Sequence, residues 1–200
     1  MSVSEKAKPL SELSDEELIA EFQQDNEAAF TELVGRYKDP LTNFTYRFLG
    51  DWDECCDAVQ DTFVRVYRSR HSYKPIAKFS TWLYTIATNL SKSYLRKRKF
   101  RSALGLGTRY EDNAERTIDP IDPEPRPDQL ADSAIMDERI QQAINTLGMK
   151  YREVIILRDI QDLSYEEIAT VTGLNIGTVK SRINRARTQL QEKLKDLLTD

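Results

Sequence analysis

Two stretches of the sequence concentrate positive charge and contain no acidic residue, a pattern that suits binding to a phosphate backbone. From Ser91 to Arg101 there are six basic residues and no acid. From Asn175 to Thr188 there are four basic residues and again no acid. Cations that neutralise phosphates release bound counterions, which favours binding to nucleic acid. Solvated helix faces are the alternative interpretation, so the elements that carry these residues must decide between the two.

The second basic stretch lies in a pattern typical of a helix-turn-helix, residues 163–187. Ser164 and Glu167 fit a capping box, in which each side chain bonds the free backbone amide of the other residue. Gly173 can adopt the positive φ that a tight turn needs, and Asn175 can cap the helix that follows. The apolar residues expected to face the core of this unit are Ile168, Ala169, Val171, Leu174, Ile176, Val179 and Ile183.

The outward face of the second helix in this pattern is polar and basic. Its residues are Thr178, Lys180, Ser181, Arg182, Asn184 and Arg185. Such a helix suits the DNA major groove, because its side chains donate to phosphates and guanine edges and no acid repels the backbone. An ordinary helical hairpin with a basic exposed face is the alternative. The turn glycine and the acid-free second helix together favour DNA binding.

The first basic stretch ends a predicted helix over Phe79–Lys99. The apolar face of this helix consists of Trp82, Leu83, Ile86, Ala87 and Leu90. Helical spacing with Ile86 and Leu90 assigns Trp82 and Leu83 to the core rather than to a binding surface. The helix before it is expected to bury Val59, Phe63 and Val66.

Upstream of these two helices, further helices complete an N-terminal helical unit. Ser14–Glu17 and Asp51–Glu54 each fit a capping box at the start of a helix. Asn26 can cap the helix between them, and Pro40 is expected to end or kink that helix. The apolar pattern continues beyond the proline to Gly50, through Leu41, Phe44, Phe48 and Leu49. These segments together predict a helical domain of about 100 residues.

Composition supports an all-α fold, since the chain has only seven glycines and seven prolines. Four of the prolines lie between Pro120 and Pro127, inside the segment Glu111–Asp132, where eight acids face two arginines for a net charge of −6. This segment is typical of an extended tether. We therefore predict a flexible N-terminus, an N-terminal helical bundle, a flexible acidic, proline-rich linker and a C-terminal helix-turn-helix bundle, over residues 1–13, 14–102, 103–131 and 132–198.

The sequence also excludes several classes of protein. No run of about 18 apolar residues could span a membrane, and the polar start Met1–Ser14 lacks the apolar centre of a signal peptide. The chain is therefore expected to be cytoplasmic. His71 is the only histidine and lies outside any ligand cluster, so no metal or other cofactor is expected. No phosphate-binding glycine loop and no nucleophile–base pair is found, which argues against an enzyme fused to a DNA-binding tail.

Three motifs in order resemble those of the extracytoplasmic-function sigma factors, group IV of the sigma-70 family: Asp57–Tyr67, Phe79–Leu90 and Ser164–Ala169. The resemblance covers residues 14–101 and 130–196. It implies an alternative, non-catalytic sigma factor that binds core RNA polymerase and directs initiation, in a stress response, at promoters with −10 and −35 elements. A conventional regulator with a ligand-sensing or dimerising N-terminal domain is the alternative, but a regulator would need neither of the first two motifs.

The resemblance also implies roles for individual residues. Those that would dock on the polymerase clamp helices are Asp57, Gln60, Asp61 and Arg65. Asn89 occupies the position that reads a flipped −10 base, and residues that would hold the opening strand are Lys92, Tyr94, Arg96, Lys97 and Arg98. Base-reading and adjacent phosphate positions of the −35 domain match Lys180, Ser181, Asn184 and Arg185, with Thr178 and Arg182 on the same face.

The same resemblance implies further partners and one departure. An anti-sigma factor is expected as a partner, with no membrane insertion by the chain itself, and the linker would run towards the RNA exit channel of the polymerase. The free protein could mask its basic helices with the acidic linker. Cys55 and Cys56 stand where many family members carry alanine and an acid. A small apolar role is favoured over a redox role, because adjacent cysteines form strained disulfides.

Overall fold

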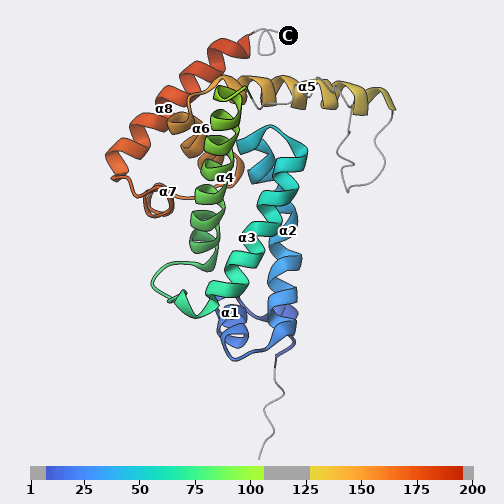
Figure 1. Cartoon of the computed structure of the whole chain (residues 1–200), viewed down its shortest axis with the longest axis vertical. Coiled ribbons are helices and arrows are strands. Elements are labelled where there is room, and N and C mark those ends of the chain that lie inside the picture. The colour runs from blue at the N-terminus through green and yellow to red at the C-terminus, as the bar shows by residue number, and fades with distance from the viewer. Residues whose placement is uncertain (1–7, 106–126, 196–200) are drawn as a thin grey trace, which may run out of the picture.

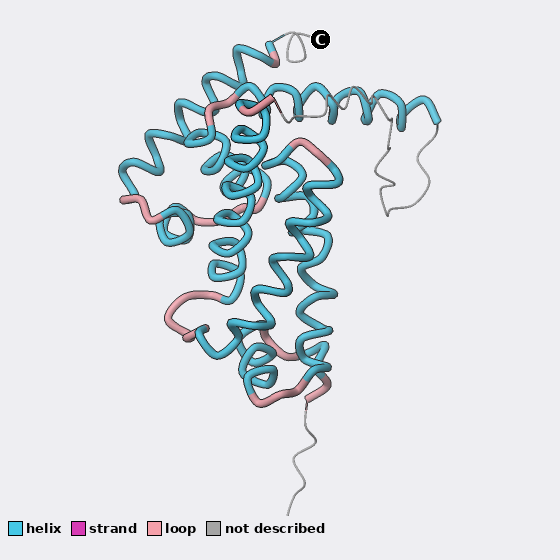
Figure 2. Tube along the Cα trace, in the orientation of Figure 1, coloured by secondary structure: helices cyan, strands magenta, loops and turns pink. Residues whose placement is uncertain are grey.

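The computed structural model describes residues 8–105 and 127–195, and within these ranges the chain forms helices and no strand (Figure 2). The first half contains η1 (Leu10–Glu12), α1 (Asp15–Gln23), α2 (Glu27–Leu49), α3 (Trp52–Ser69), η2 (Arg70–Ser72) and α4 (Phe79–Ala103). The second half contains α5 (Pro127–Thr146), α6 (Met149–Ile155), the π-helical turn η3 (Ile156–Ile160), α7 (Tyr165–Thr172) and α8 (Ile176–Lys193). The all-α prediction is confirmed. We call these halves the first and second domains.

The first domain is a bundle in which α2, α3 and α4 lie along one another and α1 closes one end (Figure 1). Its largest fully buried side chains include Phe22, Phe44, Phe48, Phe79 and Leu83. The predicted capping box at the start of α1 is present: the Ser14 amide donates to Glu17 over 2.7 Å, and the Glu17 amide donates to the Ser14 hydroxyl over 3.2 Å. Leu83 is fully buried as expected, and Trp82 is partly buried against the same core.

Two local signals in α2, at Asn26 and Pro40, had different outcomes. Asn26 does not cap the helix; its side chain donates instead to Glu21. Pro40 does not end the helix, which runs on to Leu49. A proline inside a helix costs about 3 kcal/mol, but the turns beyond it bury Leu41 and Phe44 completely, and this packing outweighs the local cost.

The structure differs from the sequence predictions at two further places, the N-terminus and the start of α3. Residues 10–13, expected to belong to a flexible N-terminus, are held by the Arg36 guanidinium, which donates to the carbonyls of Leu10, Ser11 and Leu13. At α3, the Asp51 side chain caps the helix by accepting from the Glu54 amide. Glu54 does not complete a capping box, because its carboxylate faces arginines of α4.

The second domain contains the predicted helix-turn-helix, formed by α7 and α8. The capping box of Ser164 and Glu167 is present, and Gly173 ends α7 with a φ of 69°. The Asn175 side chain accepts from the Thr178 amide over 2.8 Å and caps α8. Ile168, Val171, Val179 and Ile183 are buried as predicted. Ile176 is not, since 39% of it is exposed; as the first residue of α8 it precedes the turn that contacts the core.

The two domains pack directly against each other in this structure. Helix α4 lies against α7, and α2 lies against α5 and η3 (Figure 1). Tyr84 on α4 donates to the Gln161 side chain after η3. Helix α5 begins at Pro127, within the segment predicted as linker, and proline suits the first position of a helix. The rest of that linker, residues 106–126, lies outside the described residues, as does its expected folding onto the basic helices.

Candidate nucleic-acid interface

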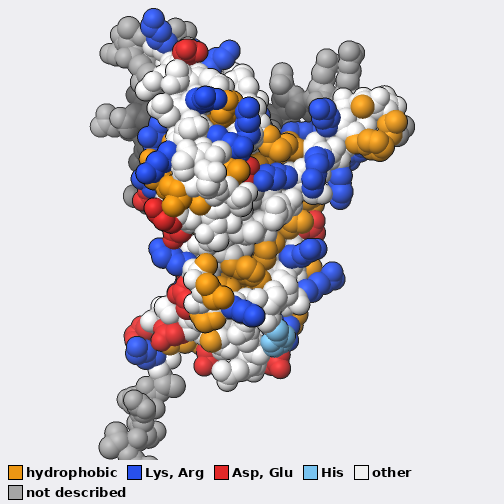
Figure 3. Space-filling view, turned by 90° about the vertical axis from the view of Figure 1, so that its left-hand side faces the viewer, with side chains coloured by type: hydrophobic (Ala, Val, Ile, Leu, Met, Phe, Trp, Pro, Cys, Tyr) orange, Lys and Arg blue, Asp and Glu red, His pale blue; other side chains and the backbone are white. Residues whose placement is uncertain are grey.

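Helix α8 presents its polar face to solvent. Val179, Ile183 and Ala186 are buried on one side of the helix and anchor it to the domain core. Of the predicted DNA-binding residues, Lys180, Ser181, Asn184 and Arg185 are exposed, while Thr178 and Arg182 are partly buried. The face of the molecule on the α7–α8 side carries many lysine and arginine side chains (Figure 3).

The cations of this α8 face are free of carboxylates. Within the described part of the chain, none of Lys180, Arg182 and Arg185 forms an ion pair. The Lys180 ammonium lies 5.6 Å from the ring centre of Tyr165, and Arg185 contacts the Tyr151 hydroxyl, whose pKa it lowers. Such contacts orient the side chains and leave their charge available. Arg187 differs, because it pairs with Asp159 over 2.5 Å and so fastens α8 to the turn before α7.

The predicted DNA-binding residues of α4 fall into two groups. Asn89, Arg96 and Lys97 are exposed. The other three are bonded to neighbouring helices, beginning with Lys92, whose ammonium lies 2.5 Å from the Glu153 carboxylate on α6. Only 5% of the Glu153 side chain is exposed, so this ion pair is largely shielded from solvent and joins the two domains.

Tyr94 and Arg98 make their contacts within the first domain. The Tyr94 hydroxyl donates to Asp61 on α3 over 2.8 Å. Partial burial and the bond to Asp61 both raise the pKa of Tyr94, so the hydroxyl remains a donor throughout the physiological range. The Arg98 guanidinium donates to the Leu49 carbonyl over 3.0 Å and lies 3.4 Å from Glu54.

The exposed side of α3 carries the four residues predicted to dock on polymerase. Asp57, Gln60, Asp61 and Arg65 are all exposed, opposite the buried residues Cys55, Ala58, Thr62 and Val66. Val64 lies beside them with 40% of its surface exposed. Polarity indicated the charged residues. Helical spacing from Val59, Phe63 and Val66 places Val64 outside the buried stripe, but an apolar side chain gave no reason to assign it to a docking surface.

Residues 33–101 match the family Sigma-70 region 2, and residues 137–190 match Sigma-70 region 4. The chain is 36% identical over 179 residues to the ECF RNA polymerase sigma factor SigW of Bacillus subtilis, covering 90% of this chain and 96% of the relative. The chain belongs to the ECF sigma factors. The RNA polymerase sigma-H factor of Pseudomonas aeruginosa is 32% identical over 197 residues, covering 96% and 99% of the two chains.

Solved structures of similar proteins agree with this family. CnrH, in complex with the cytosolic domain of CnrY, superposes with a TM-score of 0.66 at 29% identity, covering 91% of this chain and 97% of CnrH. The sigma factor RpoE from Bartonella quintana, in complex with the anti-sigma factor NepR, gives a TM-score of 0.64 at 29% identity, covering 83% and 96%. This chain is an alternative sigma factor for transcription initiation, and sigma factors are non-catalytic specificity subunits of RNA polymerase.

The two adjacent cysteines of this sigma factor lie in different environments. Cys55 is buried, with its sulfur 3.0 Å from the Thr45 hydroxyl, and burial raises the pKa of the thiol to about 11. Cys56 is exposed, and the two sulfurs form no disulfide. Cys55 therefore acts as a small core residue, as expected. Among residues 8–105 and 127–195, no cluster of metal-ligating side chains and no helix suited to crossing a membrane occurs.

The sequence did not reveal two buried charged residues on α6. Arg152 is 9% exposed and Glu153 is 4% exposed, and both contact the first domain. Their only signal is their place directly before the buried run Val154–Leu157. A charge pair at the start of an apolar run gives no local sign of burial, and only the packing of the domains explains it.

Proposed function

We propose that this sigma factor recognises promoter DNA with two helices, α4 at the −10 element and α8 at the −35 element. Helix α3 would dock on the clamp helices of the core polymerase. The observation that carries this proposal is that each helix has an acid-free basic stretch, Ser91–Arg101 on α4 and Asn175–Thr188 on α8, and keeps base-reading positions in solvent. These positions are Asn89 on α4 and Lys180, Ser181, Asn184 and Arg185 on α8. The family resemblance assigns base reading to these same positions.

On α8, recognition would take the ordinary form for a helix-turn-helix. The exposed face enters the major groove, where Arg185 can donate two hydrogen bonds to a guanine edge. Ser181 and Asn184 are exposed beside Arg185, and both can bond base edges or phosphates. The buried stripe behind them and the Arg187–Asp159 ion pair keep the helix in a fixed orientation.

On α4, recognition would require an unpaired strand. The Asn89 amide can bond the Watson–Crick edge of a base that has left the stack, and Arg96 and Lys97 can contact the adjoining phosphates. Lys92 can reach a phosphate only after its ion pair with Glu153 breaks. Use of Lys92 at the −10 element would therefore require this contact between α4 and α6 to open, whereas Asn89, Arg96 and Lys97 are already exposed.

The partners of this chain follow from its place in the family. Sigma factors bind core polymerase and promoter DNA, which would place the chain in the cytoplasm. RpoE of Bartonella quintana, with a similar fold, was solved with its anti-sigma factor NepR. This supports an anti-sigma factor as a partner here too.

Run-off transcription tests the proposal. The full chain is added to purified core polymerase on promoter DNA from the same organism, with core alone as control. We expect transcripts that start at defined positions only when the chain is present. If the chain binds the DNA by itself but neither binds core nor starts transcripts, it is a conventional regulator and the proposal fails.

A further inference from the structure

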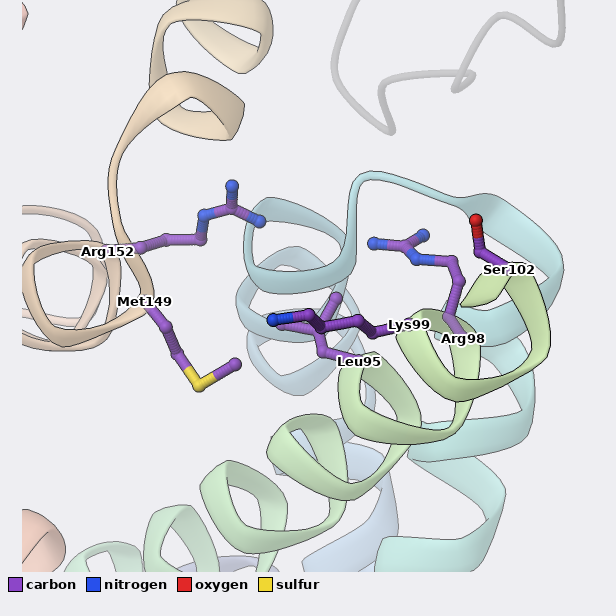
Figure 4. A pocket seen from close by; sticks show the side chains of 6 residues that line it. All are labelled: Leu95, Arg98, Lys99, Ser102, Met149 and Arg152. Carbon is purple, nitrogen blue, oxygen red and sulfur yellow. The ribbon is translucent and has the colours of Figure 1, made fainter. Parts of the chain in front are cut away.

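A cavity of about 410 Å³ lies between the last turns of α4 and the start of α6, where the two domains meet (Figure 4). It is lined by Leu95, Arg98, Lys99, Ser102, Met149 and Arg152. Three of these six residues are cations and none is an acid. The cavity therefore concentrates positive charge without any counter-charge in its own lining.

Arg152 is the most buried of the three cations. Its guanidinium donates to the Phe48 carbonyl over 3.0 Å and to the carbonyls of Asn145 and Leu147. Its Nε atom is buried and has no partner, and among the described residues no carboxylate pairs with it. Burial and the nearby charge of Arg98 lower the pKa of Arg152. An uncompensated buried charge is costly, and an anion beside it would relieve that cost.

The other two cations approach from α4. The guanidinium groups of Arg98 and Arg152 extend toward each other from opposite sides of the cavity, and the Lys99 side chain also extends into the space between α4 and α6 (Figure 4). Arg98 has Glu54 at 3.4 Å, on α3 outside the cavity lining, whereas no carboxylate among the described residues pairs with Lys99. Like charges that face each other repel, so an anion between them would stabilise this geometry further.

We propose that this cavity binds a small molecule through a diphosphate group. Phosphoryl oxygens point in several directions and accept the paired N–H groups of guanidinium, so one diphosphate can bond Arg98, Lys99 and Arg152 together. A carboxylate has only two oxygens, both on one edge, so it matches three donors that approach from different sides less well than a diphosphate does. The volume of about 410 Å³ exceeds what a single phosphate needs and accommodates a diphosphate with part of its ester.

A diphosphate in this position would connect the two domains. Arg98 belongs to α4 and Arg152 to α6, so the bound anion would hold these helices together and stabilise the packed arrangement. The inference does not rest on promoter recognition, since it needs only the charges and the cavity. It adds a small-molecule signal that would act on the same domain contact as the Lys92–Glu153 ion pair.

Isothermal titration calorimetry of the full chain tests the inference, with inorganic pyrophosphate and ADP as probes at constant ionic strength. Lys99→Gln removes one cavity charge from an exposed side chain and should leave the fold intact, unlike changes at the buried Arg152. Lys74→Gln is the matched control, because Lys74 is exposed in the loop at the other end of α4. We expect one saturable site, weakened about tenfold by Lys99→Gln and unchanged by Lys74→Gln.

Two results would overturn the inference. One is the absence of saturable binding of either probe at millimolar concentration. The other is equal weakening by Lys99→Gln and Lys74→Gln, which would show a general charge effect rather than a site. Within the expected result, tighter binding of ADP than of pyrophosphate indicates a nucleoside diphosphate as the ligand, and equal binding indicates the free diphosphate.

Discussion

On α8, Lys180 and Arg185 are exposed above a buried stripe, whereas on α4, Lys92 and Arg98 are already bonded to groups of neighbouring helices. Both helices have acid-free basic stretches of similar composition. The difference arises from what packs against them. Helices α2 and α3 bond Arg98 and the second domain bonds Lys92, while nothing in the described chain covers the polar face of α8. Basic composition alone therefore predicts which helix can bind DNA, but not which is available in the free protein.

The largest expected effect comes from breaking the ion pair that covers α4. Glu153→Gln leaves Lys92 without its counter-charge and should lower the free energy of unfolding by about 3 kcal/mol, the lower end for a buried pair because Lys92 is 26% exposed. The same change should strengthen binding of a −10 single strand by the free chain. Chemical denaturation and fluorescence anisotropy measure the two effects.

Glu192→Gln is a matched control for this change, because Glu192 is an exposed acid on α8. Glu192→Gln should change stability and single-strand binding much less than Glu153→Gln does. If Glu153→Gln also leaves both unchanged, the ion pair does not restrain α4 and the contrast with α8 disappears.

A second prediction concerns α8, whose polar face is exposed in the free protein. Arg185→Ala should weaken binding of a −35 duplex by about 2 kcal/mol, roughly thirtyfold, because one bidentate contact to a base edge is lost. Affinity for core polymerase should not change. Lys193→Ala, a basic exposed residue further along the same helix, should have little effect on duplex binding. A drop in core affinity for Arg185→Ala would show that the second domain has another role.

Asn89→Ala addresses base reading on α4. Asn89 is exposed, so its loss should leave stability unchanged. We expect the preference for the correct −10 base to fall by about 1 kcal/mol, while overall binding weakens less. Competition between −10 oligonucleotides that differ at single positions measures this preference. Equal loss on every sequence would mean that Asn89 does not read bases.

The smallest effect concerns pH and the contact between Lys78 and Glu167, whose charged atoms lie 2.8 Å apart. The bond to Lys78 and the capping bonds with Ser164 lower the pKa of Glu167 below its usual 4.5. The stabilisation is thus complete above pH 4.5 and is lost as the pH falls through the lowered pKa. Wild type should exceed Glu167→Gln in stability by under about 1 kcal/mol near neutral pH.

Thermal unfolding of both proteins across the acidic range checks this prediction. The difference between them should shrink as the buffer becomes more acidic. A difference that stays constant with pH would assign the effect to packing rather than to charge.

Local signals in the sequence predicted the helix-turn-helix and much of the first domain correctly. The caps at Ser14, Ser164 and Asn175 and the positive φ at Gly173 depend only on neighbouring residues, so the sequence alone could indicate them. The continuation of α2 through Pro40 depends on packing from other helices. The apolar pattern after the proline indicated that helical spacing continues to Gly50, but it could not show whether the helix breaks at Pro40.

Local patterns also gave only part of the candidate site, because they do not contain contacts between helices. Helical periodicity placed Arg185 on an exposed face correctly, because that helix has one clear apolar side, while Asn89 was singled out by the family resemblance and is exposed. It could not show that Lys92 meets Glu153, since those residues are 61 positions apart and belong to different domains. Contacts between domains depend on tertiary geometry, which the spacing of residues along one helix does not contain.

Footprinting of a promoter by the chain alone and by the chain with core polymerase tests the central claim most directly. The account predicts that the chain alone protects only the −35 element, through the available face of α8. With core polymerase, it should also protect the −10 element and make its thymines reactive to permanganate as the strands open. Opening of the −10 element by the chain alone, or no protection of either element with core, would contradict the account.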